Sequence, residues 1–331
     1  MWTVFSGGSR KPPETSVHAN GQAASFSERM YFMSKQYENL LFQLDKLHRH
    51  NRQGSFRTRQ RYYEAMQRFC RFLADEYHVE RLANIAPKHI SAYVARLQEK
   101  GRSASTIKTD LSAIRFFHDL IPSPRYELPG NDSLMLQRRT FGEEDRTWST
   151  PEFNRMLMAA LGAGREDYVT ILYLGRYAAL RIHECFRIDT ATAGKAVKEN
   201  ALTIKGKGGL VRTVPLNDLL VKRLQLHLET TPRGHKLFVS DDEQTHEAIK
   251  RFQVFIYLQR QSVQDPNSTR PMTFHGLRHT RAAEWYQEFI QEGKSPYEAR
   301  KAVSKLLGHG RDDVTRIYLA SVGKKGGRDG T

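Results

Sequence analysis

The sequence contains little of what secreted or membrane-spanning proteins depend on. It has two cysteines in 331 residues, Cys70 and Cys185, and no Cys-x-x-Cys pair, so we expect two reduced thiols and no disulfide framework. Its longest apolar stretch, residues 168–180, is interrupted by Arg176 and is too short to span a bilayer. The N-terminal residues lack the basic and apolar regions of a signal peptide. These absences predict a soluble intracellular protein.

Acidic residues are scarce relative to basic ones. Asp and Glu number 36 against 52 Lys and Arg, which gives a formal net charge of +16. Such an excess favours a polyanionic partner, because neutralising phosphates releases condensed counterions. A ribosomal or membrane-surface protein can be equally basic, so charge alone leaves the class open. A hydrophobic content of 39% and an aromatic content of 10% indicate a folded chain, long enough for two domains.

Metal-ligand patterns are missing as well. The 13 histidines are scattered, and none has a paired cysteine at the spacing of a zinc site. We therefore expect no metal site.

Two segments precede the first expected domain. Residues 1–24 are rich in Gly, Ser and Pro without periodicity, and we expect them to be disordered. Residues 25–55 predict an extra helix, which begins with a capping box at Ser25-x-x-Glu28 and continues with apolar residues at helical spacing. Its apolar stripe suits either packing on the next domain or docking on a neighbouring protomer.

Residues 56–121 predict a compact helical domain with helices over 58–76, 87–100 and 103–120. Basic side chains are spread over these helices. Candidate DNA contacts among them are Arg57, Arg59, Arg61, Arg68, Arg71, Lys108 and Arg115. The alternative is that they form solvated faces of a helical bundle.

The remaining chain predicts a linker and a second, larger domain. Residues 122–147 combine Pro and Gly with charge and read as a linker. Thr150, as an N-cap before Pro151, opens the domain at 148–320, and residues 321–331 form a short Gly/Lys-rich tail. The domain reads as mainly α-helical with one β-hairpin, whose strands at 202–204 and 211–214 flank a Gly-rich turn.

Residues suited to hold and attack a phosphate occur in a fixed order within this domain. They are Arg181, Lys207, His275, Arg278, His309 and Tyr318. A phosphodiester repels nucleophiles through its negative charge. Cleavage therefore needs cations on the non-bridging oxygens, an in-line nucleophile and an acid for the leaving oxygen. Arginine suits the first task, since its planar fork stays protonated at any working pH.

This ordered series, with its local contexts, resembles the catalytic domain of the tyrosine recombinases, the phage-integrase family. Residues 56–121 resemble the helical core-binding domain, a SAM-like domain, that precedes the catalytic domain in that family. The resemblance covers residues 56–121 and 150–320 and leaves out the first 50. It departs from the family pattern at Ala179, because many members have glycine two residues before the arginine.

The resemblance implies roles for the residues around the phosphate. Arg181 and Arg278 would bind the scissile phosphate, and His309 would donate a hydrogen bond to it. Tyr318, the last of 14 tyrosines, would be the nucleophile. A phenol attacks poorly at neutral pH until a base or cations favour its deprotonation, and the surrounding Arg and His residues would provide that setting.

The other matched positions concern proton transfer and orientation. Lys207 would protonate the leaving 5′ oxygen, and Lys205, two residues earlier, is the alternative. His275 would assist proton transfer with the nucleophile, and its i, i+3 spacing places it on one helix face with the second arginine. Glu184 would orient a buried basic residue. His279 is expected to point elsewhere on the helix in a structural role.

The family resemblance implies a site-specific recombinase that cuts one strand at a time through a 3′-phosphotyrosine. It implies four protomers on two paired duplexes with inverted-repeat sites, in the bacterial cytoplasm or nucleoid, and no metal or nucleotide cofactor. We favour an integrase of a mobile element over a recombinase that resolves chromosome or plasmid dimers. A type IB topoisomerase-like enzyme and an inactive DNA-binding relative are further alternatives. Target sequence and accessory proteins cannot be read from the chain.

Overall fold

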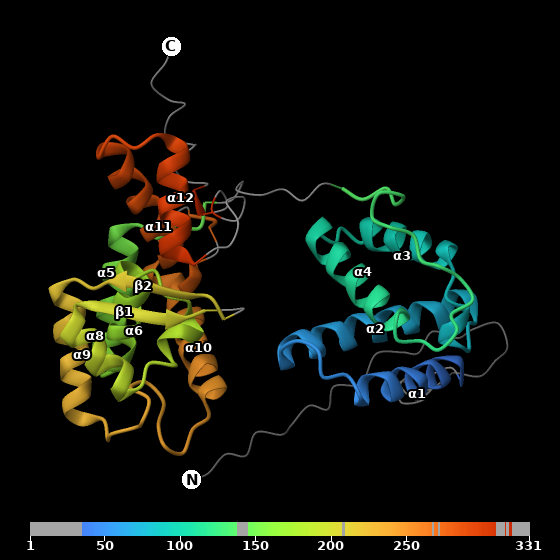
Figure 1. Cartoon of the computed structure of the whole chain (residues 1–331), viewed down its shortest axis with the longest axis horizontal. Helices are drawn as coiled ribbons and strands as arrows, with labels where there is room; N and C mark the ends of the chain where they lie inside the picture. Colours follow the sequence, from blue (N-terminus) through green and yellow to red (C-terminus); the bar gives the residue numbers. More distant parts are fainter. Residues whose placement is uncertain are drawn as a thin grey trace, which may run out of the picture. The chain divides into compact units, whose positions relative to one another are not determined.

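The computed structural model describes residues 35–137, 145–206, 209–266, 268–270, 272–308, 315, 318 and 319. The chain divides into two compact units on either side of the 139–140 bond (Figure 1). Both units are built mainly from helices, and one two-stranded antiparallel sheet belongs to the second. The predicted fold class, mainly α with a small β-hairpin, is confirmed.

The first unit is a small helical bundle. Its helices are α1 (Lys35–Arg49), α2 (Phe56–Tyr77), the 3-10 turn η2 (Leu82–Asn84), α3 (Pro87–Glu99) and α4 (Ala104–His118). Serine side chains start two of them, because Ser55 and Ser103 accept hydrogen bonds from the backbone N–H groups of the first turn. At the other end of α2, His78 adopts a left-handed conformation, with φ 50°, and ends the helix.

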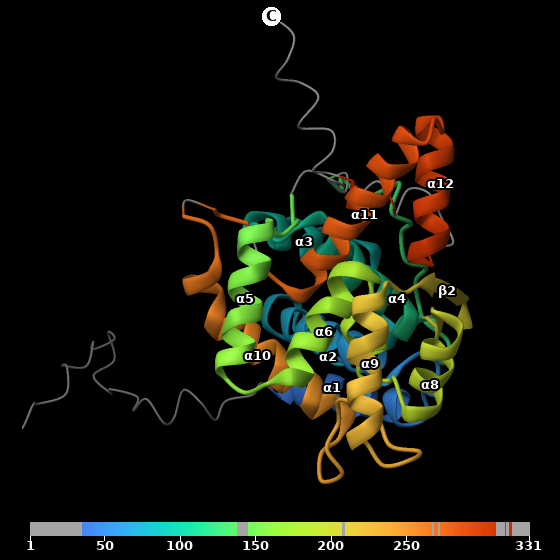
Figure 2. The same cartoon turned by 90° about the vertical axis from the view of Figure 1, so that its left-hand side faces the viewer.

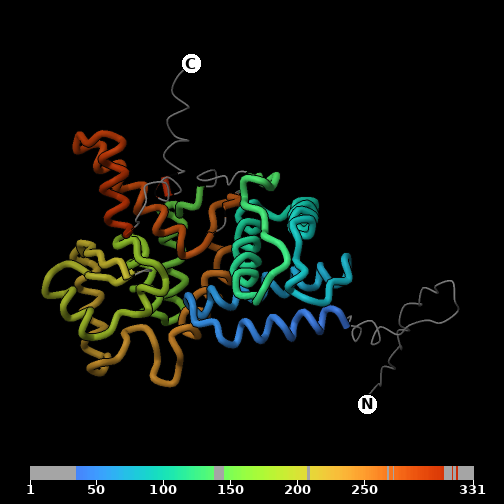
Figure 3. The backbone as a smooth tube through the Cα atoms, turned by 45° about the vertical axis from the view of Figure 1, so that its right-hand side comes forward, coloured from blue at the N-terminus to red at the C-terminus, as the bar shows by residue number. Residues whose placement is uncertain are grey.

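Helix α1 belongs to this unit and lies along α2 (Figure 3). Its stripe of Tyr37, Leu40 and Leu44 is buried in one apolar cluster with side chains of α2, including Phe69. For residues 35–49 the packing is therefore that of the first alternative, a helix on the neighbouring domain. The capping box expected at Ser25-x-x-Glu28 lies outside the described residues.

Much of the segment that follows α4 is also attached to the first unit. Leu134 is buried in the apolar cluster. The Arg115 guanidinium donates hydrogen bonds to the Pro129 carbonyl at 2.7 and 3.1 Å and to the Asn131 side chain at 2.9 Å. Residues 129–134 are thus fixed against α4 and do not act as free chain.

The second unit surrounds helix α6. Its elements are α5 (Thr150–Gly162), α6 (Glu166–Tyr177), α7 (Ile182–Cys185), α8 (Thr190–Glu199), β1 (Ala201–Lys205), β2 (Val211–Pro215), α9 (Asp218–Thr230), α10 (Thr245–Val263), α11 (Phe274–Gln291) and α12 (Pro296–Leu307). Helix α6 packs against α5, α9 and α11 (Figure 2). Strands β1 and β2 pair antiparallel with Thr203 opposite Thr213, as the hairpin pattern predicts.

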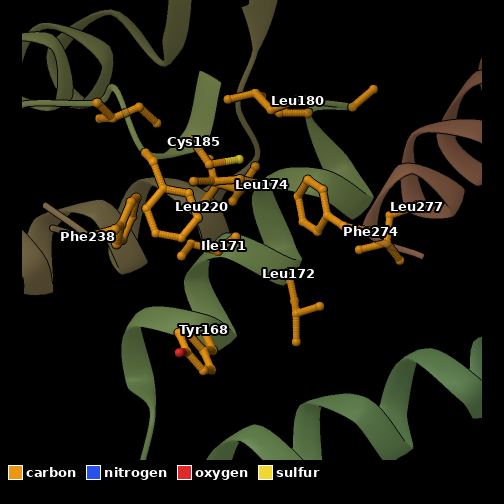
Figure 4. Packing of buried hydrophobic residues seen from close by; sticks show 14 of the residues in the cluster. Tyr168, Ile171, Leu172, Leu174, Leu180, Cys185, Leu220, Phe238, Phe274 and Leu277 are labelled. Atoms are coloured by element: carbon orange, nitrogen blue, oxygen red, sulfur yellow. The ribbon is translucent and has the colours of Figure 1, made fainter. Parts of the chain in front are cut away.

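The core of this unit explains why α6 is apolar around much of its circumference. Ile171, Leu172 and Leu174 are fully buried among side chains from α7, α9 and α11 (Figure 4). The approach of α11 is so close that a Cβ at Gly175 would lie 2.7 Å from the Phe274 ring. A side chain at that position would force the two helices apart, because real Cβ contacts are essentially never that short.

Helix α5 begins one residue earlier than predicted. The N-cap of α5 is Ser149, whose hydroxyl accepts from the Glu152 N–H. The predicted N-cap, Thr150, is instead the first helical residue, since Glu152 completes a capping box one residue earlier than expected.

Among the described residues, every helix is too short or too polar to cross a membrane.

Candidate active site

Arg181 lies at the start of the short helix α7, directly after the turn that ends α6. It is the N-cap residue, and its backbone N–H donates to Glu184 Oε2 at 2.7 Å. Its guanidinium donates to Glu184 Oε1 at 3.0 Å, while its side chain remains 21% exposed. The glutamate therefore holds both ends of the arginine and leaves part of its fork open to a ligand.

Arg278 on α11 is fully buried. Its two terminal nitrogens donate to the backbone carbonyls of Ala179 and Leu307. Burial and the charge of Arg181 lower the pKa of Arg278 to about 10, so it stays protonated at neutral pH. These two contacts fix the plane of the guanidinium beside Arg181 and Tyr318.

The turn between α6 and α7 carries an unusual backbone conformation. Ala179 adopts φ 49°, which costs a residue with a Cβ about 1–2 kcal/mol relative to glycine. Its carbonyl accepts a hydrogen bond from Arg278. The departure from glycine noted in the sequence thus falls at a left-handed position, and the contact with the buried guanidinium helps to hold the alanine there.

His275 and Tyr318 lie next to each other and beside Arg278. The Tyr318 hydroxyl lies 3.0 Å from Nε2 of His275, and the Arg278 guanidinium carbon lies 5.5 Å from the centre of the tyrosine ring. Burial, together with the charges of Arg278 and Arg181, lowers the pKa of His275 to about 4. The imidazole is therefore neutral at pH 7 and can accept the phenol proton.

His279 is part of this cluster, contrary to the expectation that it points elsewhere. Its ring stacks on Tyr318, with the ring centres 4.3 Å apart and the planes 23° from parallel. It also meets His275 edge to face at 5.2 Å. The physical reason is helical period, because residues at i and i+4 share a face as well as those at i and i+3. The structural role expected for His279 stays a prediction.

Gly276, the glycine of the His-Gly-Leu-Arg motif, lets Trp148 approach α11 closely. A Cβ at Gly276 would lie 2.6 Å from the Trp148 indole. Trp148 is held there by two hydrogen bonds, from its indole N–H to the Thr273 carbonyl and from its backbone N–H to the Thr280 hydroxyl, each 2.9 Å. The segment ahead of α5 thereby locks the first turn of α11 and, with it, His275 and Arg278.

Two predicted residues, Lys207 and His309, lie outside the described residues. The described residues next to them are Lys205, Gly206 and Gly308. Lys205 is exposed at the end of β1, and the Gly206 N–H continues the hairpin by donating to the Leu210 carbonyl at 2.8 Å. On the other side, Gly308 ends α12 in a left-handed conformation, with φ 65°.

One charged residue of the site is not among those predicted from the sequence. Arg212 on β2 is buried, and its two terminal nitrogens donate to the two oxygens of Glu184 at 2.8 and 2.6 Å. Burial alone would raise the pKa of Glu184, but the hydrogen bonds and charge of Arg212 outweigh it and lower that pKa to about 2. The signal in the sequence was strand alternation, which places Arg212 on the buried face with Val214.

The structure brings together Arg181, Arg278, His275 and Tyr318, with Glu184 behind the first arginine. Such a set can bind an anion between two guanidinium groups and present a hydroxyl next to a neutral base. Within the described residues, no group of His, Cys, Asp or Glu side chains is arranged to hold a metal ion.

The candidate DNA contacts of the first unit occupy different environments. Arg61 and Arg68 share the buried carboxylate of Asp110, at 2.6 and 3.2 Å, so this trio keeps one net positive charge. Arg71 stacks its guanidinium over the Tyr37 ring at 3.9 Å. Arg115 is engaged with the 129–131 segment as described above. Arg57 is exposed, and Arg59 and Lys108 are half-buried.

We expect the second unit to lose stability as pH falls from 7 to 5. His275 and His279 have pKa values of about 4 and 3 in the fold, below the ordinary value near 6.5. In this pH window the unfolded chain binds more protons, so the free energy of unfolding decreases as pH falls. Urea unfolding, followed by the fluorescence of buried Trp148 and Trp285, measures this.

The free energy of unfolding of the double variant His275→Gln/His279→Gln should depend less steeply on pH, because its two substituted side chains do not titrate. Other histidines contribute equally to both proteins, so the difference isolates this pair. Equal slopes for the variant and the wild type would show that the two histidines are not held neutral by the fold.

Comparison with known proteins identifies the family. The model of the phage integrase N-terminal SAM-like domain matches residues 45–121, and that of the phage integrase family matches residues 152–324. The chain is 21% identical over 280 residues to tyrosine recombinase XerD of Halalkalibacterium halodurans, covering 79% of this chain and 86% of the relative. It is 24% identical over 261 residues to XerD of Staphylococcus aureus, covering 73% and 81%.

Solved structures share the fold at lower sequence identity. A lambda integrase dimer bound to a COC′ core site matches with a TM-score of 0.62 and 17% identity, covering 88% of this chain and 98% of that one. The Tn1549 transposon integrase in complex with transposon right end DNA matches with a TM-score of 0.56 and 15% identity, covering 86% and 98%. The chain belongs to the phage integrase family of tyrosine recombinases, enzymes that cleave and rejoin DNA at specific sites.

Proposed function

We propose that this recombinase is the integrase of a mobile element and that Tyr318 is its nucleophile. It would act as a tetramer on two paired duplexes that carry inverted-repeat sites. The observation that carries the catalytic assignment is the 3.0 Å approach of the Tyr318 hydroxyl to a histidine whose pKa is about 4, beside a buried arginine. The names of two structural neighbours, lambda integrase and the Tn1549 transposon integrase, agree with the integrase role.

In this mechanism the Tyr318 oxygen attacks the phosphorus while its proton passes to Nε2 of His275. Arg181 and Arg278 neutralise the two non-bridging oxygens, on which charge builds in the transition state. The bond from phosphorus to the 5′ oxygen breaks, and Lys207 gives that oxygen a proton. The strand then remains attached through a 3′-phosphotyrosine, so its bond energy is kept for rejoining. His309 would donate a further hydrogen bond to the phosphate.

The second candidate is a recombinase that resolves chromosome or plasmid dimers, because the curated relatives named above are XerD recombinases. Sequencing the DNA exchanged in cells separates the two roles. An integrase joins the ends of an element to a separate locus, whereas a resolving enzyme removes the segment between two direct copies of its site. The sequenced exchange site also supplies the substrate for all later assays. This substrate is a duplex that carries the site with a nick, and we call it the junction duplex.

The tetramer is tested with the same DNA. Sedimentation of the protein on two paired junction duplexes should give a particle of four protomers. A stable complex of one protomer per duplex that still exchanges strands would contradict the tetramer.

We expect Lys207→Ala to lose cleavage of the ordinary junction duplex and to recover it when the leaving 5′ oxygen is replaced by sulfur. A thiolate leaves without a proton, so the missing acid no longer matters. General acids typically contribute roughly 100- to 10,000-fold, and the covalent band on a denaturing gel measures the recovery. Lys205→Ala is the matched control, and a sulfur rescue confined to that variant would move the acid two residues along the hairpin.

We propose that the first unit contacts DNA phosphates through members of its basic set, foremost Arg57, Arg59 and Lys108. The slope of log affinity against log salt should fall in magnitude by roughly 0.9 for each true phosphate contact removed. Alanine variants at the three positions should show this in a filter-binding titration. Arg115→Ala should leave the slope unchanged, because its guanidinium is occupied within the unit. A smaller salt slope for Arg115→Ala, with unchanged slopes for the other three variants, would place the DNA on the other side of α4.

A further inference from the structure

Arg212 makes no contribution to the mechanism above, yet it lies at the centre of the elements that carry the mechanism. It is 6% exposed, and both of its terminal nitrogens are used by Glu184. A buried charge of this kind is costly unless its geometry is well matched. The two-pronged contact to a fully buried carboxylate provides that match.

The carboxylate that Arg212 holds is the one that orients Arg181. Glu184 Oε1 accepts from both guanidinium groups, at 3.0 Å from Arg181 and 2.8 Å from Arg212. Its Oε2 accepts from the Arg181 backbone at 2.7 Å and from Arg212 at 2.6 Å. Each carboxylate oxygen by which Glu184 holds Arg181 therefore also accepts a hydrogen bond from Arg212. Without Arg212, the glutamate would lose two of its four anchors and could rotate.

Arg212 also touches the backbone that leads to Lys207 and His309. A Cβ at Gly308 would lie 2.9 Å from Cδ of Arg212, so the residue before His309 packs directly on the arginine stem. A Cβ at Gly206, the residue before Lys207, would lie 3.5 Å from an Arg212 terminal nitrogen and 3.6 Å from Glu184. The N-terminus of α7, the hairpin turn and the end of α12 thus converge on one side chain.

We propose that Arg212 is a positioning residue for strand cleavage: through Glu184 it sets the orientation of Arg181, and its side chain packs against Gly206 and Gly308, the residues that precede Lys207 and His309. It does not contact the DNA. The proposal rests on the proposed function, because it takes Arg181 as a phosphate ligand and Lys207 as the acid.

The test compares cleavage of the junction duplex by Arg212→Met with cleavage by the wild type. Misplacing a catalytic group by about 1 Å can cost on the order of 100-fold, and we expect a loss of that order. Arg212→Lys should not restore the rate, since an ammonium cannot grip both carboxylate oxygens. Arg251→Met is the matched control, because Arg251 makes a similar two-pronged contact, to Glu243 at 2.9 and 2.7 Å, outside the site.

Two readouts separate positioning from a general loss of folded protein. In an Arg181→Ala background, the fold-loss caused by Arg212→Met should be smaller than in the wild-type background, because the part of the loss that passes through Arg181 is already absent and residues that act as a unit are non-additive. The ratio of the rates on the sulfur-substituted and ordinary duplexes should rise for Arg212→Met, as it does for Lys207→Ala. A loss of folded enzyme would lower both rates equally and leave that ratio unchanged.

If Arg212→Met does not fold, Glu184→Gln/Arg212→Met replaces the buried pair with neutral groups and carries the same expectations. A full multiplicative loss in the Arg181→Ala background, with an unchanged sulfur ratio, would overturn the proposal and leave Arg212 as a folding residue. A failure of the proposed function looks different: Tyr318→Phe would then still form the covalent band, or Lys207→Ala would show no sulfur rescue, whatever Arg212 does.

Discussion

Tyr318→Phe is expected to bind the junction duplex with near-normal affinity and to form no covalent protein–DNA band. The change removes one oxygen, the atom that attacks phosphorus, and keeps the ring that stacks on His279 at 4.3 Å. The packing of the pocket should therefore survive. A denaturing gel of the nicked duplex detects the adduct, and a gel-shift titration detects binding.

Tyr286, on α11 of the same unit and partly buried, provides the matched control. Tyr286→Phe should form the adduct at the wild-type rate, because its hydroxyl has no place in the mechanism. A covalent band from Tyr318→Phe, or its loss from Tyr286→Phe alone, would move the nucleophile away from residue 318.

Arg181→Lys and Arg278→Lys should each slow cleavage by roughly 100- to 1,000-fold, the usual cost of removing one preorganised donor to a transition-state oxyanion. Lysine keeps the charge but not the planar fork. For Arg278 the loss is compounded, because two buried carbonyls, those of Ala179 and Leu307, lose their donors. Single-turnover cleavage of the junction duplex measures the effect.

Arg176→Lys is the control for these two variants. Arg176 also makes a two-pronged contact, to Glu284 at 2.5 and 2.6 Å, and is 12% exposed, but it has no role in the proposed mechanism. It should lower stability without changing the rate of the folded enzyme. Near-normal cleavage by both catalytic lysine variants would mean that the arginines serve the fold alone.

Much of the site follows from residue order in the sequence. The i, i+3 spacing predicts a shared face for His275 and Arg278, and both lie beside Tyr318, with the histidine 3.0 Å from its hydroxyl. The Gly-rich turn between two β-prone runs predicts the hairpin, and its strands pair as expected. These features are local, since each depends on helix or strand period over a few residues.

What the sequence did not reveal depends on contacts between distant segments. Glu184 and Arg212 are 28 residues apart along the chain, and no local pattern names one as the partner of the other. Alternation in β2 does show that Arg212 faces inward, where a buried charge requires a carboxylate. The prediction that His279 points away from the site is wrong for a different reason: its i, i+4 spacing places it on the same helix face as His275.

The helical unit shows the same limit. A row of basic residues on α2 suggests an open phosphate-binding face, but the structure places Asp110 of α4 against two of them, 42 and 49 residues away in the chain. The number of free positive charges on that face is therefore set by helix packing. It could not be counted from the helix sequence alone.

The central claim is that Tyr318 becomes covalently joined to a DNA 3′ phosphate. It is tested most directly by trapping the adduct on the junction duplex, digesting it with nuclease and protease, and sequencing the nucleotide-bearing peptide by mass spectrometry. The account predicts a single modified peptide, with the phosphate on Tyr318 and the nucleotide attached through its 3′ oxygen. A modification on another residue, or attachment through a 5′ oxygen, would contradict it.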